Sequence, residues 1–233
     1  MQVGQAVVVI PAHNEVSDLP SCLKAMVTAA ACAPFPVKIV VVLDACDDDS
    51  RELAGQFGDD VQFVEVDVRN VGAARRAGFE YAQQLSVTDS RTWYATTDAD
   101  TRVDADWVVR QTDSAADVVL GVVRIVNWRR FSPAAARRYL SAYRSKFHAG
   151  GHGHVHGANM GFSAEAYWGV GGFAPLSSDE DVDLARRFEA AGYRIARDNQ
   201  LSVVTSARRI GRAPRGFAKH LRNIAPRARR GTV

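Results

Sequence analysis

Short apolar runs alternate along the first half of the chain with segments whose apolar residues recur at helical spacing. The runs are rich in β-branched residues and end near Pro, Gly or Asp, which is typical of strands buried on both faces. The predicted strands cover residues 6–10, 37–43, 61–66, 93–96 and 118–126. A first helix is predicted to begin near residue 17, and a short second helix to begin at residues 47–50 and end at 57. Three further helices are predicted over 74–85, 104–113 and 133–147. This alternation predicts an α/β fold with a mostly parallel central sheet and helices on both faces.

The second half of the chain has a less regular pattern. It opens with the glycine-rich stretch 150–154, whose composition predicts flexibility. The elements predicted after it are strands at 159–163, 193–196 and 201–205, a helical turn at 164–168, and a helix over 179–191 that Gly192 ends. We therefore expect a small mixed subregion beside the main sheet. A basic helix is predicted over 214–224, with disorder beyond Pro226.

Charge is distributed unevenly along the chain. The net charge is +3, but nine Lys and Arg residues lie from Arg208 onward, and no acid follows Asp198. The remainder carries 20 basic and 26 acidic residues, a net charge of −6. A basic tail on an acidic body predicts contact with phosphate-rich material: a nucleotide, a membrane surface or nucleic acid.

The sequence carries no signal for membrane insertion, secretion or disulfides. No apolar run approaches the roughly 18 residues of a spanning helix, and the N-terminus has no secretory pattern. Cys22, Cys32 and Cys46 lack C-x-x-C spacing, which argues against a disulfide framework or a zinc knuckle. The expected location is the cytoplasm, with the basic tail allowing peripheral contact with the inner face of the membrane.

Five carboxylates fall where predicted strands end or predicted helices begin: Glu15, Asp44, Asp98, Asp100 and Asp181. Ligands of open α/β sheets collect outside the carboxyl ends of the strands, so these side chains can share one polar cleft. The Asp98 and Asp100 pair suits a hard divalent cation, which prefers oxygen ligands and often bridges to substrate phosphates. Each has an ordinary alternative, because Asp-x-Asp is common in turns and residues 178–181 fit a capping box.

Six short motifs occur together in this chain. They are Val8–Glu15 (VVIPAHNE), Val41–Asp44 (VVLD) followed by acids, Asn70–Arg75 (NVGAAR), Thr97–Asp100 (TDAD), Gly157–Met160 (GANM) and Glu180–Leu184 (EDVDL). In this order and combination, the chain resembles family 2 glycosyltransferases of the GT-A fold over roughly residues 6–210. The resemblance implies one GT-A domain over 1–210, with a nucleotide-binding half of about 1–126 and an acceptor-side half of about 127–210. The basic tail, 211–233, follows it.

The resemblance also implies roles for the matching positions. The donor would be a UDP- or GDP-sugar, with Asp44 at the base edge and Asp98 near the ribose. The donor-binding residues would be Pro11, Ala12, Glu15, Asp44, Arg75, Asp98 and Ala99. Asp100 would be the main protein ligand of Mg²⁺ or Mn²⁺, and Asp181 the general base. The acceptor-side residues would be His156, Gly157, Ala158, Asn159 and Glu180.

These implied roles are consistent with the chemistry of sugar transfer. A nucleoside diphosphate departs with negative charge, which a divalent ion stabilises. A carboxylate on the opposite face of the sugar takes the proton of the acceptor hydroxyl. One base and an in-line displacement invert the anomeric carbon. We therefore expect an inverting, metal-dependent glycosyltransferase.

The residues leave alternatives open for Arg75 and for three histidines. Arg75 opens a predicted helix, where it would contact the donor or remain a solvated charge. His152, His154 and His156 alternate, so an extended segment would place them on one face. There they would bind a metal ion, serve the acceptor or a mobile loop, or be structural.

The C-terminal region departs from some members of the family. Residues 205–209 contain no His, which leaves a third protein ligand for the metal in doubt. Arg208 and Arg209 would neutralise the diphosphate or simply belong to the basic tail. In that tail, Arg212, Arg215, Lys219 and Arg222 have helix-compatible spacing and would dock on an anionic membrane.

Two other functions fit parts of the pattern. A sugar-nucleotide nucleotidyltransferase usually has a glycine-rich basic loop after its first strand, where this chain has Pro11–Glu15. A non-catalytic nucleotide- or nucleic-acid-binding module would need only the basic tail, and the joint presence of Asp100 and Asp181 disfavours it. We expect no nucleic acid partner. The sequence does not determine the sugar, the base, the acceptor or the oligomeric state.

Overall fold

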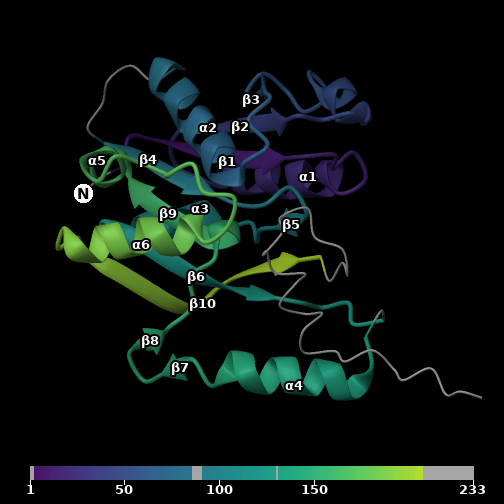
Figure 1. The fold of residues 1–233 in the computed structure, drawn as a ribbon. Helices are drawn as coiled ribbons and strands as arrows, with labels where there is room; N and C mark the ends of the chain where they lie inside the picture. Colours follow the sequence, from purple (N-terminus) through teal and green to yellow (C-terminus); the bar gives the residue numbers. More distant parts are fainter. Residues whose placement is uncertain (1–2, 86–90, 130, 207–233) are drawn as a thin grey trace, which may run out of the picture.

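An eight-stranded sheet forms the centre of the computed structural model, which describes residues 3–85, 91–129 and 131–206 (Figure 1). Its spatial order is β3-β2-β1-β4-β9-β6-β10-β5. The strands are β1 (Gln5–Ala12), β2 (Val37–Asp44), β3 (Val61–Val66), β4 (Thr92–Thr96), β5 (Thr101–Arg102), β6 (Val118–Arg124), β9 (Met160–Ser163) and β10 (Ile195–Thr205). The first four in spatial order are parallel, β9 is antiparallel to both of its neighbours, and β10 is parallel to β6. The predicted mostly parallel sheet is confirmed.

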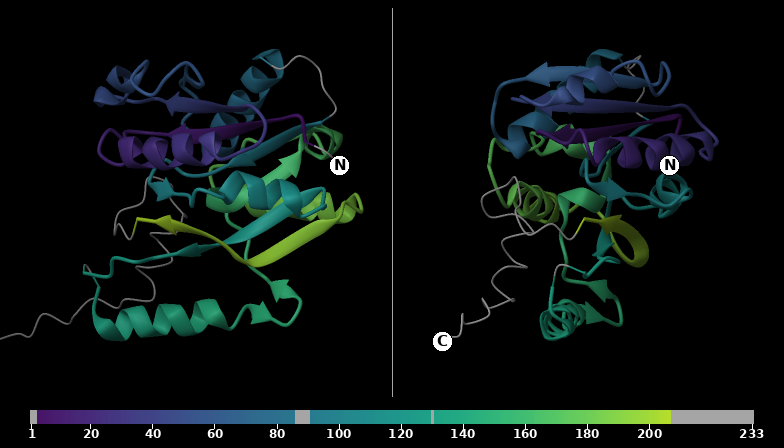
Figure 2. Two further views of the ribbon diagram at one scale, coloured as in Figure 1. Left: turned by 180° about the vertical axis from the view of Figure 1, so that it is seen from behind. Right: turned by 90° about the vertical axis from the view of Figure 1, so that its right-hand side faces the viewer.

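Helices cover both faces of this sheet (Figure 2). On one face lie α1 (Leu19–Ala31) and α3 (Trp107–Asp113), and on the other lie α2 (Val71–Leu85), α5 (Ala164–Gly169) and α6 (Glu180–Ala190). The alternation of side chains along a strand explains the division. In β1, Val8 and Ile10 join the core under α1, whereas Val7 and Val9 join the core under α2.

An aromatic cluster fills the core on the α2 face. The ring of Phe79 lies 4.9 Å from that of Tyr94, 5.5 Å from Phe162 and 4.8 Å from Tyr167, measured between centroids. All four side chains are almost fully buried. The cluster therefore joins α2 to β4, β9 and α5, and it ties the first half of the chain to the second.

The structure corrects several sequence predictions. The helix expected to end at 57 is only the 3₁₀ turn η1 (Asp49–Leu53), because Ala54 leaves the helical region and Gly55 adopts a φ of +77°. The two strands expected at 193–196 and 201–205 are one strand, β10, with an irregular register between Arg197 and Ser202. The short strand β5 was not predicted, because two residues carry no periodic pattern.

A separate helix and hairpin extend from the end of the sheet. They comprise α4 (Pro133–Arg144), β7 (Phe147–His148) and β8 (Gly151–His152), followed by the 3₁₀ turn η2 (Gly157–Asn159). In both figures α4 stands apart from the layers that cover the sheet. The stretch 150–154, predicted to be flexible, supplies β8 and two buried imidazoles, so part of it is ordered by pairing.

The region from 207 onward, including the helix predicted over 214–224, lies outside the described residues. Among the described residues, no helix combines the length and apolarity needed to cross a bilayer. Cys22, Cys32 and Cys46 are free thiols, in agreement with the sequence prediction.

Replacing Phe79 with Ala should lower the free energy of unfolding by about 3–5 kcal/mol, because the mutation leaves a cavity among three other rings. Chemical denaturation measures this loss. Gln83→Ala on the exposed side of the same helix is the control, with an expected change within roughly 0.5 kcal/mol. Equal losses for the two variants would contradict the proposed role of the aromatic cluster.

Candidate functional site

Hydrogen bonds join the loop that follows β1 to the loop that follows β2. Asn14 adopts a left-handed φ of 55°, and its Oδ1 accepts the backbone N–H groups of Asp47, at 2.8 Å, and Asp48, at 3.3 Å. The Val16 N–H donates to Asp48 Oδ2 at 2.9 Å, and the buried Glu15 donates its N–H to Ser50 Oγ at 3.2 Å. The polar residues at this edge of the sheet therefore form one connected rim.

Pro11 and Ala12 are the last two paired residues of β1. The strand continues through both residues, opposite Val42 and Leu43, instead of ending before them as predicted. Pro11 is half-buried and Ala12 is buried. The sequence prediction of a loop from Pro11 was wrong by two residues. Proline lacks a backbone N–H, so a strand continues through it wherever that one donor is not needed for pairing.

Asp44, at the end of β2, organises the loop that leads to α2. Its Oδ1 accepts the N–H groups of Val68, at 2.9 Å, and Arg69, at 2.8 Å, and its Oδ2 accepts the Asn70 N–H at 2.9 Å. The carboxylate is 6% exposed. Asp44 therefore holds the start of α2 in place from the adjoining strand.

A hollow of about 680 Å³ lies beside these loops. His13, Cys46, Arg51, Glu65 and Arg69 are among the residues that line it. Asp98, Asp100 and Asp181 are not among them. The hollow thus borders the β1–β3 half of the sheet and does not enclose the acids at the end of β4.

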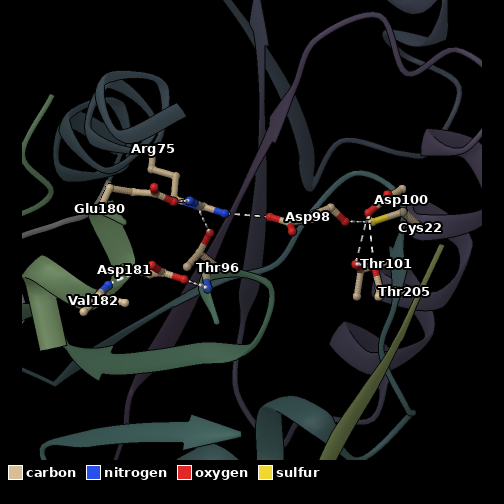
Figure 3. A network of polar contacts seen from close by, with 11 residues as sticks. Cys22, Arg75, Thr96, Asp98, Asp100, Thr101, Glu180, Asp181, Val182 and Thr205 are labelled. Atoms are coloured by element: carbon tan, nitrogen blue, oxygen red, sulfur yellow. Dashed lines mark hydrogen bonds and ion pairs between the residues drawn. The ribbon is translucent and has the colours of Figure 1, made fainter. Parts of the chain in front are cut away.

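A buried guanidinium connects two parts of the chain that are far apart in sequence. Arg75 of α2 donates through Nη2 to Asp98 Oδ1 at 2.6 Å and through Nη1 to Glu180 Oε1, and its Nε contacts Thr96 Oγ1 at 3.2 Å (Figure 3). Its side chain is only 3% exposed, that of Glu180 is 8% exposed and that of Asp98 is 41% exposed. Arg75 is therefore an internal ion-pair residue and not the solvated surface charge considered above.

Asp181 follows Glu180 at the start of α6. Its Oδ2 accepts the Gly157 N–H at 2.7 Å and its Oδ1 accepts the Val182 N–H at 2.7 Å. Burial, and next the negative charge of Glu180, raise the pKa of Asp181 to about 6. The charge of Arg75 opposes this rise in the pKa, and so do the two backbone N–H groups. The capping box considered as an alternative for residues 178–181 does not form, because Asp179 is the N-cap and its side chain makes no cap hydrogen bond.

Asp100 lies on the other side of Asp98, against the last strands of the sheet. Its Oδ1 accepts the hydroxyl groups of Thr101, at 3.3 Å, and Thr205, at 3.2 Å (Figure 3). Pairing of β5 with β10 sets Thr101 opposite Thr205. Burial raises the pKa of the nearby Cys22 thiol, and the charges of Asp100 and Asp98 raise it further. The thiol therefore stays protonated.

A model of one protein family matches most of the chain. The family is described as Glycosyl transferase family 2, and the match covers residues 7–171. The chain belongs to glycosyl transferase family 2. A search of curated proteins finds no match.

Solved structures share the fold at low sequence identity. Residues 1–349 of TarS from S. aureus, in complex with UDP-GlcNAc, superpose with a TM-score of 0.65 at 13% identity, over 96% of this chain and 65% of that one. The mannosyltransferase PcManGT from Pyrobaculum calidifontis, in complex with GDP-Man and Mn²⁺, superposes with a TM-score of 0.64 at 18% identity, over 91% of this chain and 59% of that one. A mycobacterial protein superposes with a TM-score of 0.59 at 19% identity, over 88% of this chain and 68% of that one. The fold is that of the GT-A glycosyltransferases, and the chain spans about two thirds or less of the first two structures.

The acidic pair of this family 2 chain fits a divalent cation through the chemistry of its donor set. Asp98 and Asp100 supply carboxylate oxygens one residue apart, directly after β4. Within the part of the chain that the structure describes, no cluster of three His, Cys, Asp or Glu side chains is placed to hold a metal ion. A Mg²⁺-type ion commonly uses one or two carboxylates and completes its shell with phosphates and water, and the donor set here is of that kind.

Of the three alternating histidines, His152 and His154 serve the structure. His152 Nε2 donates to the Leu120 carbonyl at 3.0 Å, and His154 Nε2 donates to the Tyr143 carbonyl at 2.9 Å. Burial lowers the pKa of His154 to about 4, and it also lowers that of His152. Both rings are therefore neutral at pH 7. His156 is half-buried and is hydrogen-bonded to the Tyr143 hydroxyl at 3.1 Å.

Asn159, expected on the acceptor side, is fully buried and fixes the sheet. Its Nδ2 donates to the carbonyls of Val122 and Leu201, each at 2.9 Å, and its Oδ1 accepts the Trp107 Nε1–H at 2.8 Å. Ala158 is buried as well. Gly157 lies against Arg75, since an added Cβ would stand 2.6 Å from its Nη2. Arg208 and Arg209 lie outside the described residues.

The sequence analysis did not identify Cys22, Thr96, Thr101 or Thr205 as site residues. The Cys22 Sγ lies 3.5 Å from the Asp98 carbonyl, and the threonines contact Arg75 or Asp100. Each contact depends on how strands and helices are placed side by side, so no local motif signals it.

Arg75→Met should destabilise the protein by about 3–5 kcal/mol, because Glu180 would remain buried without its partner charge. Arg75→Lys should recover only part of the loss, since an ammonium cannot replace the planar fork that contacts both acids. Chemical denaturation measures both.

The adjacent Arg76 provides the matched control. Its side chain is 42% exposed and pairs with Glu80 one turn away, so Arg76→Met should cost about 1 kcal/mol or less. Similar losses at positions 75 and 76 would contradict the internal role of Arg75.

Proposed function

We propose that this chain is an inverting, metal-dependent glycosyltransferase that moves a sugar from a nucleoside-diphosphate sugar to an acceptor hydroxyl. The observation that carries the proposal is the convergence of Asp98, Asp100 and Asp181 at one edge of a GT-A sheet, with Arg75 between their segments. Family membership favours this function over a nucleotidyltransferase or a binding module. The nucleotide sugars and Mn²⁺ bound in two structural neighbours support the donor class and the metal.

The rim formed by the β1 and β2 loops is proposed to hold the nucleoside. Asp44 Oδ2 accepts one backbone N–H, whereas Oδ1 accepts two, so Oδ2 retains a lone pair for a ring N–H of uracil or guanine. Glu15, Pro11 and Ala12 lie beside it at the ends of the parallel strands, where α/β proteins bind nucleotides. Asp98, whose side chain is 41% exposed, is proposed to face the ribose.

Asp100 is proposed to hold the divalent cation together with the donor diphosphate. The hydroxyl groups of Thr101 and Thr205 orient its carboxylate through Oδ1. When bound, the cation stabilises the negative charge that develops on the leaving diphosphate. Arg208 and Arg209 follow Thr205 closely in sequence and are proposed to contact the same group.

Asp181 is proposed to take the proton of the acceptor hydroxyl. The two backbone N–H groups that it accepts fix its orientation at the start of α6, and Glu180, held by Arg75, lies behind it. A raised pKa makes the carboxylate a stronger base while leaving most of it ionised at pH 7. With a single base opposite the leaving group, the anomeric carbon is inverted.

The domain division predicted from the sequence remains part of the proposal. Residues 1–210 act as one unit, with the donor side in about 1–126 and the acceptor side in about 127–210. A cytoplasmic location and a membrane contact through the basic tail are likewise proposed from the sequence. The identity of the acceptor is left open.

Asp181→Asn should preserve donor binding and lower the rate of sugar transfer by about 10²–10⁴-fold, because the amide cannot accept the proton. In the unchanged enzyme, the rate should fall as the pH drops below about 6, since protonation removes the basic form of Asp181. Initial rates of nucleoside diphosphate release over a range of pH measure both effects.

Asp179→Asn is the matched control for Asp181. Asp179 is exposed and has a left-handed φ of 61°, which Asn adopts readily. This variant should retain the rate and the pH profile. Full activity in Asp181→Asn would remove Asp181 from the role of base.

Asp100→Asn should abolish the part of nucleotide binding that depends on Mn²⁺. With UDP or GDP, Mn²⁺ should raise the melting temperature of the unchanged protein, because a ligand that binds only the folded state stabilises it. The variant should show no such increment. Asp106→Asn, at an exposed position whose side chain makes no cap bond, should behave as the unchanged protein does. The same Mn²⁺ increment in Asp100→Asn would contradict the assignment.

A further inference from the structure

The segment from residue 118 to residue 164 contains no Asp or Glu. It carries seven basic residues, namely Arg124, Arg129, Arg130, Arg137, Arg138, Arg144 and Lys146. The remainder of the chain before Arg208 carries 13 basic residues and 26 acidic ones. Within the body of the protein, positive charge is therefore concentrated in the part that contains α4 and its hairpin.

The outward side of α4 displays this charge. Ala135 and Tyr139 are buried and mark the inward side of the helix. Arg137, Leu140 and Arg144 recur at i, i+3 and i+7 on the opposite side, and all three are exposed. The figures agree that α4 stands at the periphery, beyond the layers that cover the sheet.

The basic residues of this surface are not neutralised by neighbouring acids. Among the described residues, no ion pair joins Arg137, Arg144 or Lys146 to a carboxylate. By contrast, several exposed arginines elsewhere, such as Arg51 and Arg194, pair with Glu65 and Asp117. The outward side of α4 therefore carries unneutralised positive charge, which favours a negatively charged partner.

Apolar side chains lie among these charges. Leu140 is 36% exposed between Arg137 and Arg144, and Val126, in the segment that leads to α4, is 61% exposed. A helix with a basic face and exposed apolar side chains is typical of a segment that lies in the interface of an anionic bilayer. A nucleic acid would satisfy the charges but would offer no apolar phase to Leu140.

We propose that the outward side of α4, formed by Arg137, Leu140 and Arg144 with Lys146 beside it, docks on an anionic lipid surface. This inference concerns binding, and it holds whether or not the proposed sugar transfer is correct. The surface is connected to the candidate site, because Tyr143 of α4 stacks on His154 with centroids 3.8 Å apart and bonds to His156. The next residue, Gly157, donates its N–H to Asp181. Docking through α4 would thus bring the acceptor side of the site close to the membrane.

Sedimentation of the full chain with phospholipid vesicles tests the proposal. Vesicles of phosphatidylcholine with phosphatidylglycerol should bind the protein, whereas vesicles of phosphatidylcholine alone should not. Replacing Arg137 and Arg144 with Gln should weaken binding by about 10- to 30-fold, because each basic residue near the surface contributes several-fold. Leu140→Ser should weaken it further without any change in charge.

A matched control removes two exposed charges elsewhere. Lys24→Gln with Arg186→Gln changes the net charge by the same amount on α1 and α6, and should leave vesicle binding close to that of the unchanged protein. Circular dichroism confirms that each variant is folded.

Three results would overturn the proposal. The first is vesicle binding unaffected by the α4 variant, which would assign binding to the basic tail. The second is an equal loss in the control, which would indicate a general charge effect. The third is binding of duplex DNA as strong as binding of vesicles, with Leu140→Ser weakening neither the DNA binding nor the vesicle binding. That result would indicate a general site for polyanions. Nucleotide binding by the α4 variant should remain normal, so a failure of the proposed transferase function is distinguishable from a failure of docking.

Discussion

The arrangement of the candidate site depends on one buried guanidinium. Arg75 is carried by α2, Asp98 follows β4 and Glu180 begins α6, so the three charges meet only when three separate elements are packed together. A buried arginine is tolerable when its charge and its donors have partners, and here each of its three nitrogens donates to a carboxylate or to the Thr96 hydroxyl. The ring of Phe173 also lies 5.6 Å from the guanidinium carbon. Removing this cation would leave like charges facing each other at the centre of the site.

The same interaction sets the electrostatic conditions at Asp181. Burial raises the pKa of Asp181, the charge of Glu180 raises it further, and the charge of Arg75 opposes the rise. The balance leaves Asp181 a moderately strong base that is still ionised near neutrality. The backbone of Gly157 completes this arrangement: its N–H donates to Asp181 Oδ2, and an added Cβ would stand 2.6 Å from Arg75 Nη2. The packing of Arg75 therefore affects both the stability of the site and the pKa of Asp181.

The antiparallel strand β9 explains why residues of the second half reach the end of β4. It lies between β4 and β6, which places η2 beside β4 and brings the Gly157 N–H to Asp181 at the start of α6. Asn159, the last residue of η2 before this strand, satisfies carbonyls of β6 and β10, and Gly121 leaves the space that its side chain needs. An asparagine in a motif associated with the acceptor side therefore serves the sheet. Beyond β6, the α4 hairpin is held by stacked Tyr and His rings, which leaves its outward side available.

The sequence by itself determined the fold class, most of the helices and strands, and the residues at the strand ends. Periodicity and β-branched runs report the local burial of backbone segments, so β1, β2, β3, β4 and α2 were predictable, and the family motifs identified Asp98, Asp100 and Asp181. Only the tertiary structure decided which of these polar residues face one another. It assigned Arg75 to an internal ion pair, Asn159 and two histidines to structural hydrogen bonds, and Thr205 to Asp100. These assignments depend on strand order, register and helix packing, which arise from contacts between residues up to about a hundred positions apart and leave no trace in a local pattern.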